Sequence, residues 1–488
     1  MIDLLARTCF SLVVLVAGIA ATAVGASAGD TTLSAATSAN PTVALAELTQ
    51  RRDAGLARFH DGIVLLHSSS GLKRWEDAGY RQDANFYYLT GMANLQDAIL
   101  ALDGPRRETL LFIGAMPPFL TAAEPMFSGL NQFTLSADDA SASAIGVTKV
   151  VNWNGFSSWL DARLKTDPNL PLYLDSGGQV GDFAGGGGDP TDLLPTANAH
   201  ILWYRAIQTR WPNASVRPAH AGLDELRAVK SADEQGLLRR AALLTRPGID
   251  AAVRSLRPGR THRQAEGDVI AAMMDAGAEG PGFWPWVRSG SSAYLPGLFA
   301  SFLDYHALDH VMASGEIARV NLGAEYAMYK GDYGRTFPVG PTFTSGQREV
   351  LDLLSRAYLA GLRVFQPGET PSDVVKASSD YVKDHRSALQ TDLGRAAADV
   401  LVTARPWSMY GHGIDMVEGV PRVFVAGNVI CWAPEFSVLG QGFYVEDMVL
   451  VTSAGHELLN PPLPYDARAL EAMKVALNRA GARDGKHS

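Results

Sequence analysis

The stretch VNLGAEYAMYKGDYGRTFPVG runs from Val320 to Gly340 and contains two β-like arms joined by a turn. The first arm ends at Asn321, and Asp332 begins the second arm eleven positions later. A hard divalent metal ion prefers anionic oxygen ligands, so one carboxylate is expected from each arm of such a hairpin. The first arm offers only the amide of Asn321. The stretch therefore predicts a metal-binding frame that lacks one of its charged ligands.

The composition of the whole chain narrows the class of protein. The chain has 488 residues, of which 47% are hydrophobic and 19% are charged, enough for two or more globular domains. Its net charge is −9 and it has no long basic run, which argues against a nucleic-acid groove or an anionic membrane surface as partner. Its two cysteines are Cys9 and Cys431, so neither an internal disulfide nor a Cys/His zinc cluster is expected.

Residues 1–28 have the features of an export signal. Arg7 precedes the apolar run CFSLVVLVAGIAATAVGA, and Ala26-Ser27-Ala28 matches a small-residue cleavage site. We therefore expect an exported protein, periplasmic or secreted, whose mature chain begins near Gly29 and no longer binds a membrane. The alternative is an uncleaved anchor, because the apolar run approaches the length that spans a bilayer.

The first half of the mature chain alternates β-like runs with helical or loop segments, which is typical of an α/β domain. A helix is expected over residues 43–58. The β-like runs lie at 62–68, 98–104, 108–115, 148–153 and 172–177. This domain is expected to cover residues 42–218.

The second half, residues 219–480, has a different pattern. It begins with two capping boxes, Ser231 with Glu234 and Thr261 with Gln264, each before an apolar helical run. From Ile317 onward the runs are β-like, apart from a helix expected over 345–362. Helices beside an antiparallel-looking sheet indicate an α+β domain.

Several motifs resemble those of the pita-bread metallopeptidases, specifically aminopeptidase P (Xaa-Pro aminopeptidase), with prolidase and creatinase as relatives. The matching segments are RQDANFYYLTG (81–91), ELRAVKSADEQGLLRRA (225–241), GDYGRTFPV (331–339), GHGI (411–414) and GFYVEDMVLVT (442–452). The resemblance covers nearly all of the mature chain. It implies an α/β aminopeptidase P-type N-terminal domain followed by an α+β pita-bread catalytic domain.

The resemblance also implies a set of metal ligands. The family binds two metal ions, often manganese, through two Asp, one His and two Glu residues. Matched one residue at a time, Asp332, His412 and Glu446 keep three ligand positions, whereas Asn321 and Ala433 stand in the other two. The departures extend to accessory groups: Pro296 and Val417 stand where the family has substrate-facing histidines, and Tyr444 stands where it has an arginine.

Charge then limits the number of ions. Asp332 and Glu446 carry two negative charges, which balance one divalent ion but not two in a low-dielectric cleft. We therefore expect one divalent ion, Mn, Fe or Zn, bound by Asp332, His412 and Glu446, with a metal-free site as the alternative. Asn321 can add a neutral oxygen. Glu435 lies two positions after Ala433 and becomes a replacement ligand if the strand slips; otherwise it is a strand-end residue near solvent.

Three functions are compatible with these residues. The first is an Xaa-Pro aminopeptidase-like metallohydrolase, with Glu446 and His412 catalytic and Tyr410, Asp415 and Glu418 binding substrate. The second is a lyase or small-molecule hydrolase on the same frame, and the third is a catalytically inactive, peptide-binding pseudoenzyme. The fold alone does not distinguish them. The expected partners are a peptide or small-molecule substrate and, by the family resemblance, a second copy of the chain in a homodimer; no nucleic acid is expected.

Overall fold

The structure is a computed structural model that describes residues 43–70, 81–114, 135–175, 199–293, 309–404 and 406–484. The chain divides into two compact units, Met1–Asn40 and Pro41–Ser488, and the description concerns the second. The expected export signal, residues 1–28, and Pro296 lie outside the described residues. Among the described helices, none combines the length and the apolar character needed to cross a membrane.

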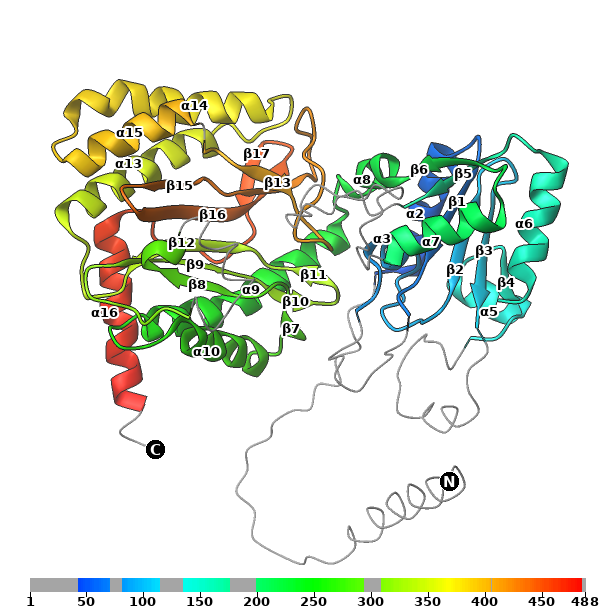
Figure 1. Cartoon of the computed structure of the whole chain (residues 1–488), viewed down its shortest axis with the longest axis horizontal. Helices are drawn as coiled ribbons and strands as arrows, with labels where there is room; N and C mark the ends of the chain where they lie inside the picture. Colours follow the sequence, from blue (N-terminus) through cyan, green and yellow to red (C-terminus); the bar gives the residue numbers. More distant parts are fainter. Residues whose placement is uncertain are drawn as a thin grey trace, which may run out of the picture. The chain divides into compact units, whose positions relative to one another are not determined.

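The N-terminal domain is built on a six-stranded mixed sheet with the order β4-β3-β2-β1-β5-β6 (Figure 1). The strands are β1 (Ile63–His67), β2 (Ile99–Asp103), β3 (Glu108–Ile113), β4 (Lys149–Asn152), β5 (Pro171–Leu174) and β6 (Ser215–Pro218). The first five fall on the predicted β-like runs. Sequence reasoning missed β6, which is short and half exposed and therefore carries little apolar signal.

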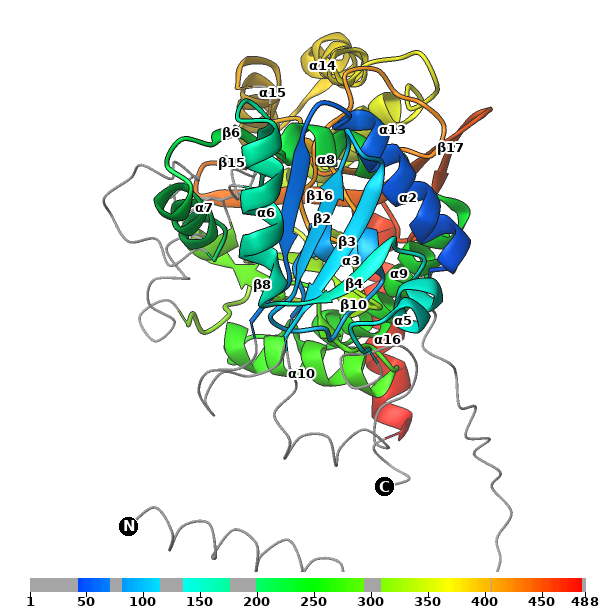
Figure 2. The ribbon, with the colours of Figure 1, turned by 90° about the vertical axis from the view of Figure 1, so that its right-hand side faces the viewer.

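Successive residues of the central strands face two different cores. Ile63 and Leu65 pack in a core that includes α6 (Gly155–Thr166) and α7 (Ala199–Arg210). Val64 and Leu66 pack in the larger core, which includes α2 (Leu45–Arg58) and α5 (Asp139–Ile145). Figure 2 shows these helix pairs on opposite faces of the sheet. Because both faces are covered, the strands read as continuous apolar runs, as sequence analysis found.

The second domain follows α8 (His220–Arg227), and both predicted capping boxes are present in it. Ser231 and Glu234 begin α9 (Ala232–Ser255), and Thr261 and Gln264 begin α10 (His262–Asp275). The predicted helix at 345–362 is α13 (Ser345–Leu362). The remaining helices are α14 (Pro371–His385), α15 (Asp392–Thr403) and α16 (Ala467–Asp484).

The main sheet of this domain has eight strands, with the central order β13-β14-β16-β12-β9-β8 and with β15 and β17 also paired to β16. Its strands are β8 (Trp286–Ser289), β9 (Ile317–Leu322), β12 (Tyr333–Pro338), β13 (Met409–Gly411), β14 (Val429–Trp432), β15 (Glu435–Val438), β16 (Gln441–Thr452) and β17 (Gly455–Leu458). A small sheet, β7 (Gly280–Pro281), β10 (Ala324–Tyr326) and β11 (Tyr329–Lys330), contains the hairpin turn inside the 320–340 stretch. Helices α13 to α15 and helices α9 and α10 lie on opposite sides of the main sheet (Figure 1). This arrangement confirms the α+β architecture expected for the second half.

Candidate metal centre and active site

Three adjacent strands place the centre of the site. In β12, Gly334 pairs with Asn321 of β9 on one side and with Glu446 of β16 on the other. A side chain at Gly334 has no room, because its Cβ would lie 1.9 Å from the carbonyl oxygen of Val320. The missing side chain leaves space across the strand: the amide nitrogen of Asn321 donates to Glu446 Oε2 at 2.9 Å and to Asp332 Oδ1 at 2.8 Å. The first strand thus contributes a hydrogen-bond donor where a carboxylate was expected.

Tyr410 of β13 joins the two carboxyl groups from the other side. Its hydroxyl lies 2.9 Å from Asp332 Oδ2 and 2.5 Å from Glu446 Oε1. The hydroxyl of Tyr444 also contacts Glu446 Oε2. A phenol has one proton to donate, so it cannot donate to Asp332 and Glu446 at once. One carboxyl group must therefore carry a proton and donate it to the oxygen of Tyr410.

The electrostatics indicate which group holds this proton. Burial, followed by the nearby Asp332 carboxylate, raises the pKa of Glu446 well above its ordinary value. Burial also raises the pKa of Asp332, although hydrogen bonds from Tyr410 and Asn321 oppose that shift. Both side chains are fully buried. When no cation is bound, burial and the neighbouring carboxylate therefore favour the protonated form of Glu446.

His412 and Cys431 lie beside this pair. Asp332, His412 and Cys431 each offer one ligand atom, and these atoms lie within 4.8 Å of one another. The His412 ring nitrogens are occupied, however: Nδ1 lies 2.8 Å from the Met416 carbonyl oxygen and Nε2 lies 2.8 Å from that of Lys330. The structure thus brings Asp332, His412 and Glu446 into one buried cluster, with Asn321 and Tyr410 between or beside them.

These residues offer ligand atoms and charge that fit a divalent ion. Asp332 and Glu446, once deprotonated, supply two negative charges, and Asp332, His412 and Cys431 present oxygen, nitrogen and sulfur atoms close together. At the two other ligand positions of the family, Asn321 offers an amide that donates to the carboxylates, and Ala433 offers only a methyl group. Asp332, His412 and Glu446 are the residues that would hold the ion, and its binding would displace the hydrogen bonds from Tyr410 and one of the two contacts of the His412 ring with the carbonyl oxygens of Met416 and Lys330.

Glu435 is a correction to the expected ligand set. It begins β15 and pairs in register with Tyr444 of β16, and its carboxylate forms an ion pair with Nη1 of Arg319. The register of β15 is therefore not shifted in the way that would bring Glu435 to Asp332. Glu435 therefore neutralises Arg319 and does not replace the glutamate missing at Ala433.

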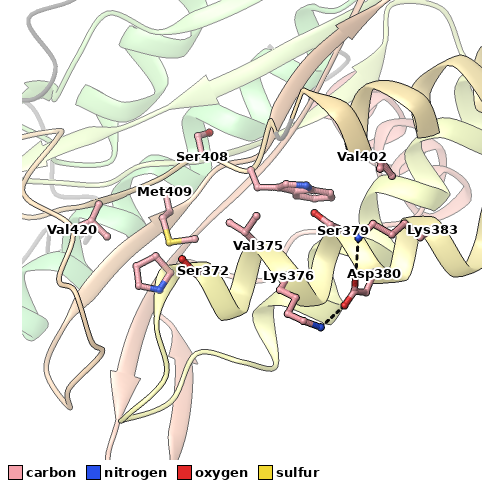
Figure 3. A pocket seen from close by; sticks show the side chains of 12 residues that line it. Ser372, Val375, Lys376, Ser379, Asp380, Lys383, Val402, Ser408, Met409 and Val420 are labelled. Atoms are coloured by element: carbon pink, nitrogen blue, oxygen red, sulfur yellow. Dashed lines mark hydrogen bonds and ion pairs between the residues drawn. The ribbon is translucent and has the colours of Figure 1, made fainter.

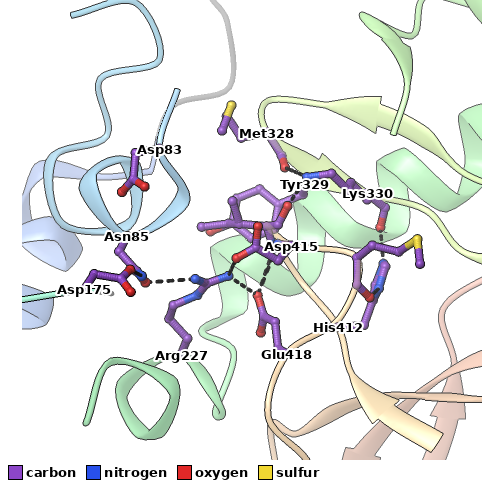
Figure 4. Close-up of polar contacts among 12 residues, drawn as sticks. Asp83, Asn85, Asp175, Arg227, Met328, Tyr329, Lys330, His412, Asp415 and Glu418 are labelled. Atoms are coloured by element: carbon purple, nitrogen blue, oxygen red, sulfur yellow. Dashed lines mark hydrogen bonds and ion pairs between the residues drawn. The ribbon is translucent and has the colours of Figure 1, made fainter. Parts of the chain in front are cut away.

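Two of the three expected substrate-binding groups, Asp415 and Glu418, are held in ion pairs with Arg227 (Figure 4). Arg227 contacts Asp415 Oδ2 at 2.7 Å and also Glu418 Oε1, while Lys230 Nζ lies 2.6 Å from Glu418 Oε2. Burial would raise the pKa of Glu418, but Arg227 and Lys230 hold it well below its usual range. Glu418 is therefore a buried structural carboxylate and not a substrate ligand. Tyr410 is at the centre, bonded to the carboxyl pair.

Two cavities lie near these strands. A cavity of about 260 Å³ is bordered by Arg319, Glu435, Phe436 and Phe443. A larger one, about 560 Å³, is lined by α14, α15 and the segment around Met409 (Figure 3). Asp332, His412 and Glu446 line neither cavity. The smaller cavity is bordered by Arg319, whose Nη2 lies 3.5 Å from Asn321 Oδ1.

Sequence reasoning missed Arg319, Tyr444 and Cys431 as members of this cluster. The signal for Arg319 was available: an arginine in the middle of the apolar run IARVNL must be buried with the strand, and a buried charge requires a partner. For Tyr444, the family motif indicates only that a tyrosine stands where the family has an arginine. The position of Cys431, paired with Tyr410 and with Met448 on neighbouring strands, depends on a register that the sequence does not contain.

Comparisons with known proteins agree with this architecture. Residues 236–453 match the model of metallopeptidase family M24, and residues 48–171 match the aminopeptidase P N-terminal domain. The Xaa-Pro aminopeptidase of Haemophilus influenzae is 25% identical over 453 residues, covering 87% of this chain and 96% of its own. The Xaa-Pro aminopeptidase of Escherichia coli is 26% identical over 465 residues, covering 89% and 98%.

Solved structures share the fold. Proline aminopeptidase P II from Yersinia pestis has a TM-score of 0.67 at 22% identity, covering 89% of this chain and all of that one (100%). A variant of Escherichia coli aminopeptidase P has a TM-score of 0.67 at 23% identity, covering 90% and 100%. The predicted fold class, a pita-bread domain after an aminopeptidase P-type domain, is confirmed. Metallopeptidases are hydrolases that use a divalent metal ion, so the match to family M24 indicates a metal-dependent hydrolase. On these matches, the chain belongs to the aminopeptidase P family of M24 metallopeptidases.

Proposed function

We propose that the chain is an Xaa-Pro aminopeptidase-like metallohydrolase that acts on peptides with proline in the second position and holds one divalent ion. The observation that carries the proposal is the pair Asp332 and Glu446, two buried carboxyl groups within hydrogen-bond distance of the same Tyr410 hydroxyl. When both groups are deprotonated, their two negative charges balance one divalent ion, which would lie between them where the Tyr410 hydroxyl now makes contact. The names of the relatives supply the substrate class.

The residues have separate roles in this proposal. A bound divalent ion would activate a water molecule and polarise the scissile carbonyl. Asp332 would serve as a ligand, and His412 as a ligand and a catalytic group. Glu446 is a ligand and also the candidate proton acceptor, because it is a buried carboxyl group in contact with the Tyr410 hydroxyl at the centre of the cluster. Turnover should be slow, since Val417 and Pro296 offer no imidazole to bind the substrate or stabilise the developing charge.

A second candidate function is peptide binding without turnover. One observation favours it: all four oxygens of Asp332 and Glu446 already contact Asn321, Tyr410 or Tyr444. A carboxyl pair that is satisfied by its own chain needs no ion to remain buried. In this case the frame would hold a peptide end as a pseudoenzyme.

Metal content and peptide hydrolysis distinguish the two functions. Wild-type protein and Asp332→Asn would be dialysed against Mn(II), desalted and analysed for metal per chain, then assayed for release of the first residue of an Xaa-Pro peptide. Asp392→Asn, at an exposed position in α15, is the control. One ion per chain and hydrolysis, both lost in Asp332→Asn alone, support the hydrolase. A folded wild-type chain with neither ion nor hydrolysis supports the peptide-binding function, and two ions refute the single-ion site.

We also propose that the protein is exported and is a homodimer. The support for export is the cleavage pattern Ala26-Ser27-Ala28 after an apolar run; the support for the dimer is family resemblance alone. N-terminal sequencing of the protein from the periplasm or medium should give a start near Gly29, and an intact Met1 on cytosolic protein would contradict export. Light scattering on the same sample gives the number of chains.

A further inference from the structure

We infer that Arg319 supplies, as a fixed guanidinium group, the positive charge that a second metal ion would bring, and that it thereby limits this centre to one ion. The inference rests on the proposed function, because it concerns the same cluster. It adds a residue that determines the metal stoichiometry of the site.

The position of Arg319 places its charge next to the empty ligand positions. It lies two residues before Asn321 on β9, so both side chains project from the same face of the strand. Its Nη2 lies 3.5 Å from Asn321 Oδ1, and its Nη1 pairs with Glu435. The amide of Asn321 is thus oriented by charge: its oxygen faces the guanidinium, and its nitrogen faces the two carboxyl groups.

Aromatic packing fixes the guanidinium in this place. Its central carbon lies 4.0 Å from the ring centroid of Tyr444 and 5.0 Å from that of Trp286. The Arg319 side chain is only 5% exposed. Burial lowers its pKa to about 10, with Glu446, Tyr410 and Asp332 opposing the shift, so the group is still charged at neutral pH. A buried guanidinium between rings is a permanent cation.

Charge counting shows why a second ion is excluded. Asp332 and Glu446 balance one divalent ion, and Glu435 balances Arg319, so the cluster with one ion is neutral. A second divalent ion would leave two uncompensated positive charges beside a guanidinium in a buried site, which is strongly unfavourable. Restoring carboxylates at positions 321 and 433 would supply the missing charge, so the block then depends on position: an aspartate at 321 would place an oxygen against Arg319 Nη2, where Asn321 Oδ1 now lies at 3.5 Å, and that oxygen would be held by the guanidinium and not by an ion.

The test uses the full chain, with Mn(II) as the probe. The double variant Asn321→Asp/Ala433→Glu restores the two ligands and should still bind no more than one ion. Adding Arg319→Met should raise the count to two ions per chain, by elemental analysis after desalting. Adding Arg319→Lys instead, which keeps the charge, should hold the count at one. Circular dichroism on every variant checks that the fold is kept.

Two results would overturn the inference: two ions in the double variant while Arg319 is present, or no more than one ion in a folded triple variant with methionine at 319. If the triple variants do not fold, the single variants decide. Arg319→Met should lower the Kd for the first Mn(II) about tenfold or more, because a nearby cation is removed, whereas Arg319→Lys should leave it unchanged. Equal Kd values for the two would refute the inference. A wild-type chain without metal contradicts the proposed function, and the multiple-variant series still decides the role of Arg319.

Discussion

Asn321 and Glu446 lie opposite each other across Gly334, and the Asn321 amide nitrogen donates to Glu446 Oε2 at 2.9 Å. The replacement of a carboxylate by an amide at position 321 therefore does more than remove a charge. It converts a ligand that would repel Glu446 into a donor that stabilises it, and the same nitrogen stabilises Asp332 at 2.8 Å. Two buried carboxyl groups can then remain in the sheet whether or not an ion is bound.

Gly334 is required for this contact, and its replacement should be strongly destabilising. In Gly334→Ala the Cβ would lie 1.9 Å from the Val320 carbonyl oxygen and 2.9 Å from the Asn321 Cα, both backbone atoms that cannot give way. We expect a loss of about 3 kcal/mol or more in the free energy of unfolding, measured by urea denaturation.

The matched control for this change is Gly267→Ala in α10, where an added Cβ meets nothing within 4 Å. An alanine inside a helix should stabilise the protein by about 0.5–1 kcal/mol. If both variants unfold at the same urea concentration as the wild type, strands β9 and β12 are not packed as closely as described.

Tyr410→Phe tests whether the phenol hydroxyl competes with a metal ion. Removing the hydroxyl leaves Asn321 as the partner that Asp332 and Glu446 share, so the metal-free protein should lose about 1–3 kcal/mol of stability. The affinity for Mn(II) should rise, because the ion no longer has to displace the hydroxyl. Isothermal titration together with thermal unfolding measures both effects.

Tyr358→Phe is the control for that experiment. The Tyr358 hydroxyl binds another buried carboxylate, Asp447 Oδ2, at 2.9 Å. Asp447 follows Glu446 on β16, so its side chain points to the opposite face of the sheet. This variant should lose stability without any change in Mn(II) affinity. A rise in affinity in both variants would mean that general loosening, and not competition, explains the effect.

The elements of the fold were largely readable from the sequence because their signals are local. Capping boxes at Ser231 and Thr261 depend on side chains three residues apart, and both begin helices as predicted. The long apolar runs of the first domain became strands buried on both faces. The short strand β6 was missed, since four half-exposed residues have no periodic pattern to detect.

The site was predictable only in part, because its contacts depend on register between distant strands. The family motifs predict Asp332, His412 and Glu446 as ligands, which stays a prediction, and they mark Asn321 as an anomaly. They could not show that Glu435 pairs with Arg319 or that Glu418 is bound by Arg227, residues 116 and 191 positions apart in the chain. Ion pairs between such remote residues are set by tertiary packing and leave no spacing rule in the sequence.

Arg227 should be among the most important charged residues for stability. Its guanidinium contacts Asp415, Glu418 and the Asn85 Oδ1 atom at 2.9 Å, and its side chain is 3% exposed (Figure 4). Arg227→Met would leave the buried Glu418 with Lys230 as its one cationic partner among the described residues. Breaking a buried pair in this way typically costs about 3–5 kcal/mol.

The control is Arg239→Met, which removes an exposed ion pair with Glu457, a surface contact worth about 1 kcal/mol or less. Urea denaturation of the two variants should therefore give midpoints that differ clearly, with Arg239→Met close to the wild type. Similar midpoints would show that the Arg227 cluster is hydrated and contributes little.

The N-terminal domain should have a pH-dependent stability that arises from His200. Its Nε2 lies 3.2 Å from Asp83 Oδ2, and the Asp83 side chain also accepts the backbone N–H of Phe86 at the start of α3 (Ala84–Thr90). Burial alone would lower the pKa of His200, but the Asp83 carboxylate raises it to about 9. The other titratable groups that act on His200 are His67, whose ring centroid is 5.1 Å away, and the carboxylates Asp175 and Asp415.

Because the folded pKa of His200 lies above its unfolded value of about 6.5, the folded state holds this proton more tightly. The stabilisation is complete below pH 6.5 and is lost as the pH rises through 9. The side chain is 23% exposed, so solvent screening reduces the effect to about 1–2 kcal/mol. In His200→Gln the ion pair is absent, and the difference in unfolding free energy from the wild type should shrink steadily between pH 6.5 and 9.5. Taking the difference in unfolding free energy between variant and wild type cancels the contribution of groups that titrate equally in both proteins.

The control is His385→Gln, at an exposed site on α14, which should differ from the wild type by the same small amount at every pH. A His200→Gln difference that does not change with pH would mean that His200 is neutral in the folded protein and that Asp83 serves only to cap α3.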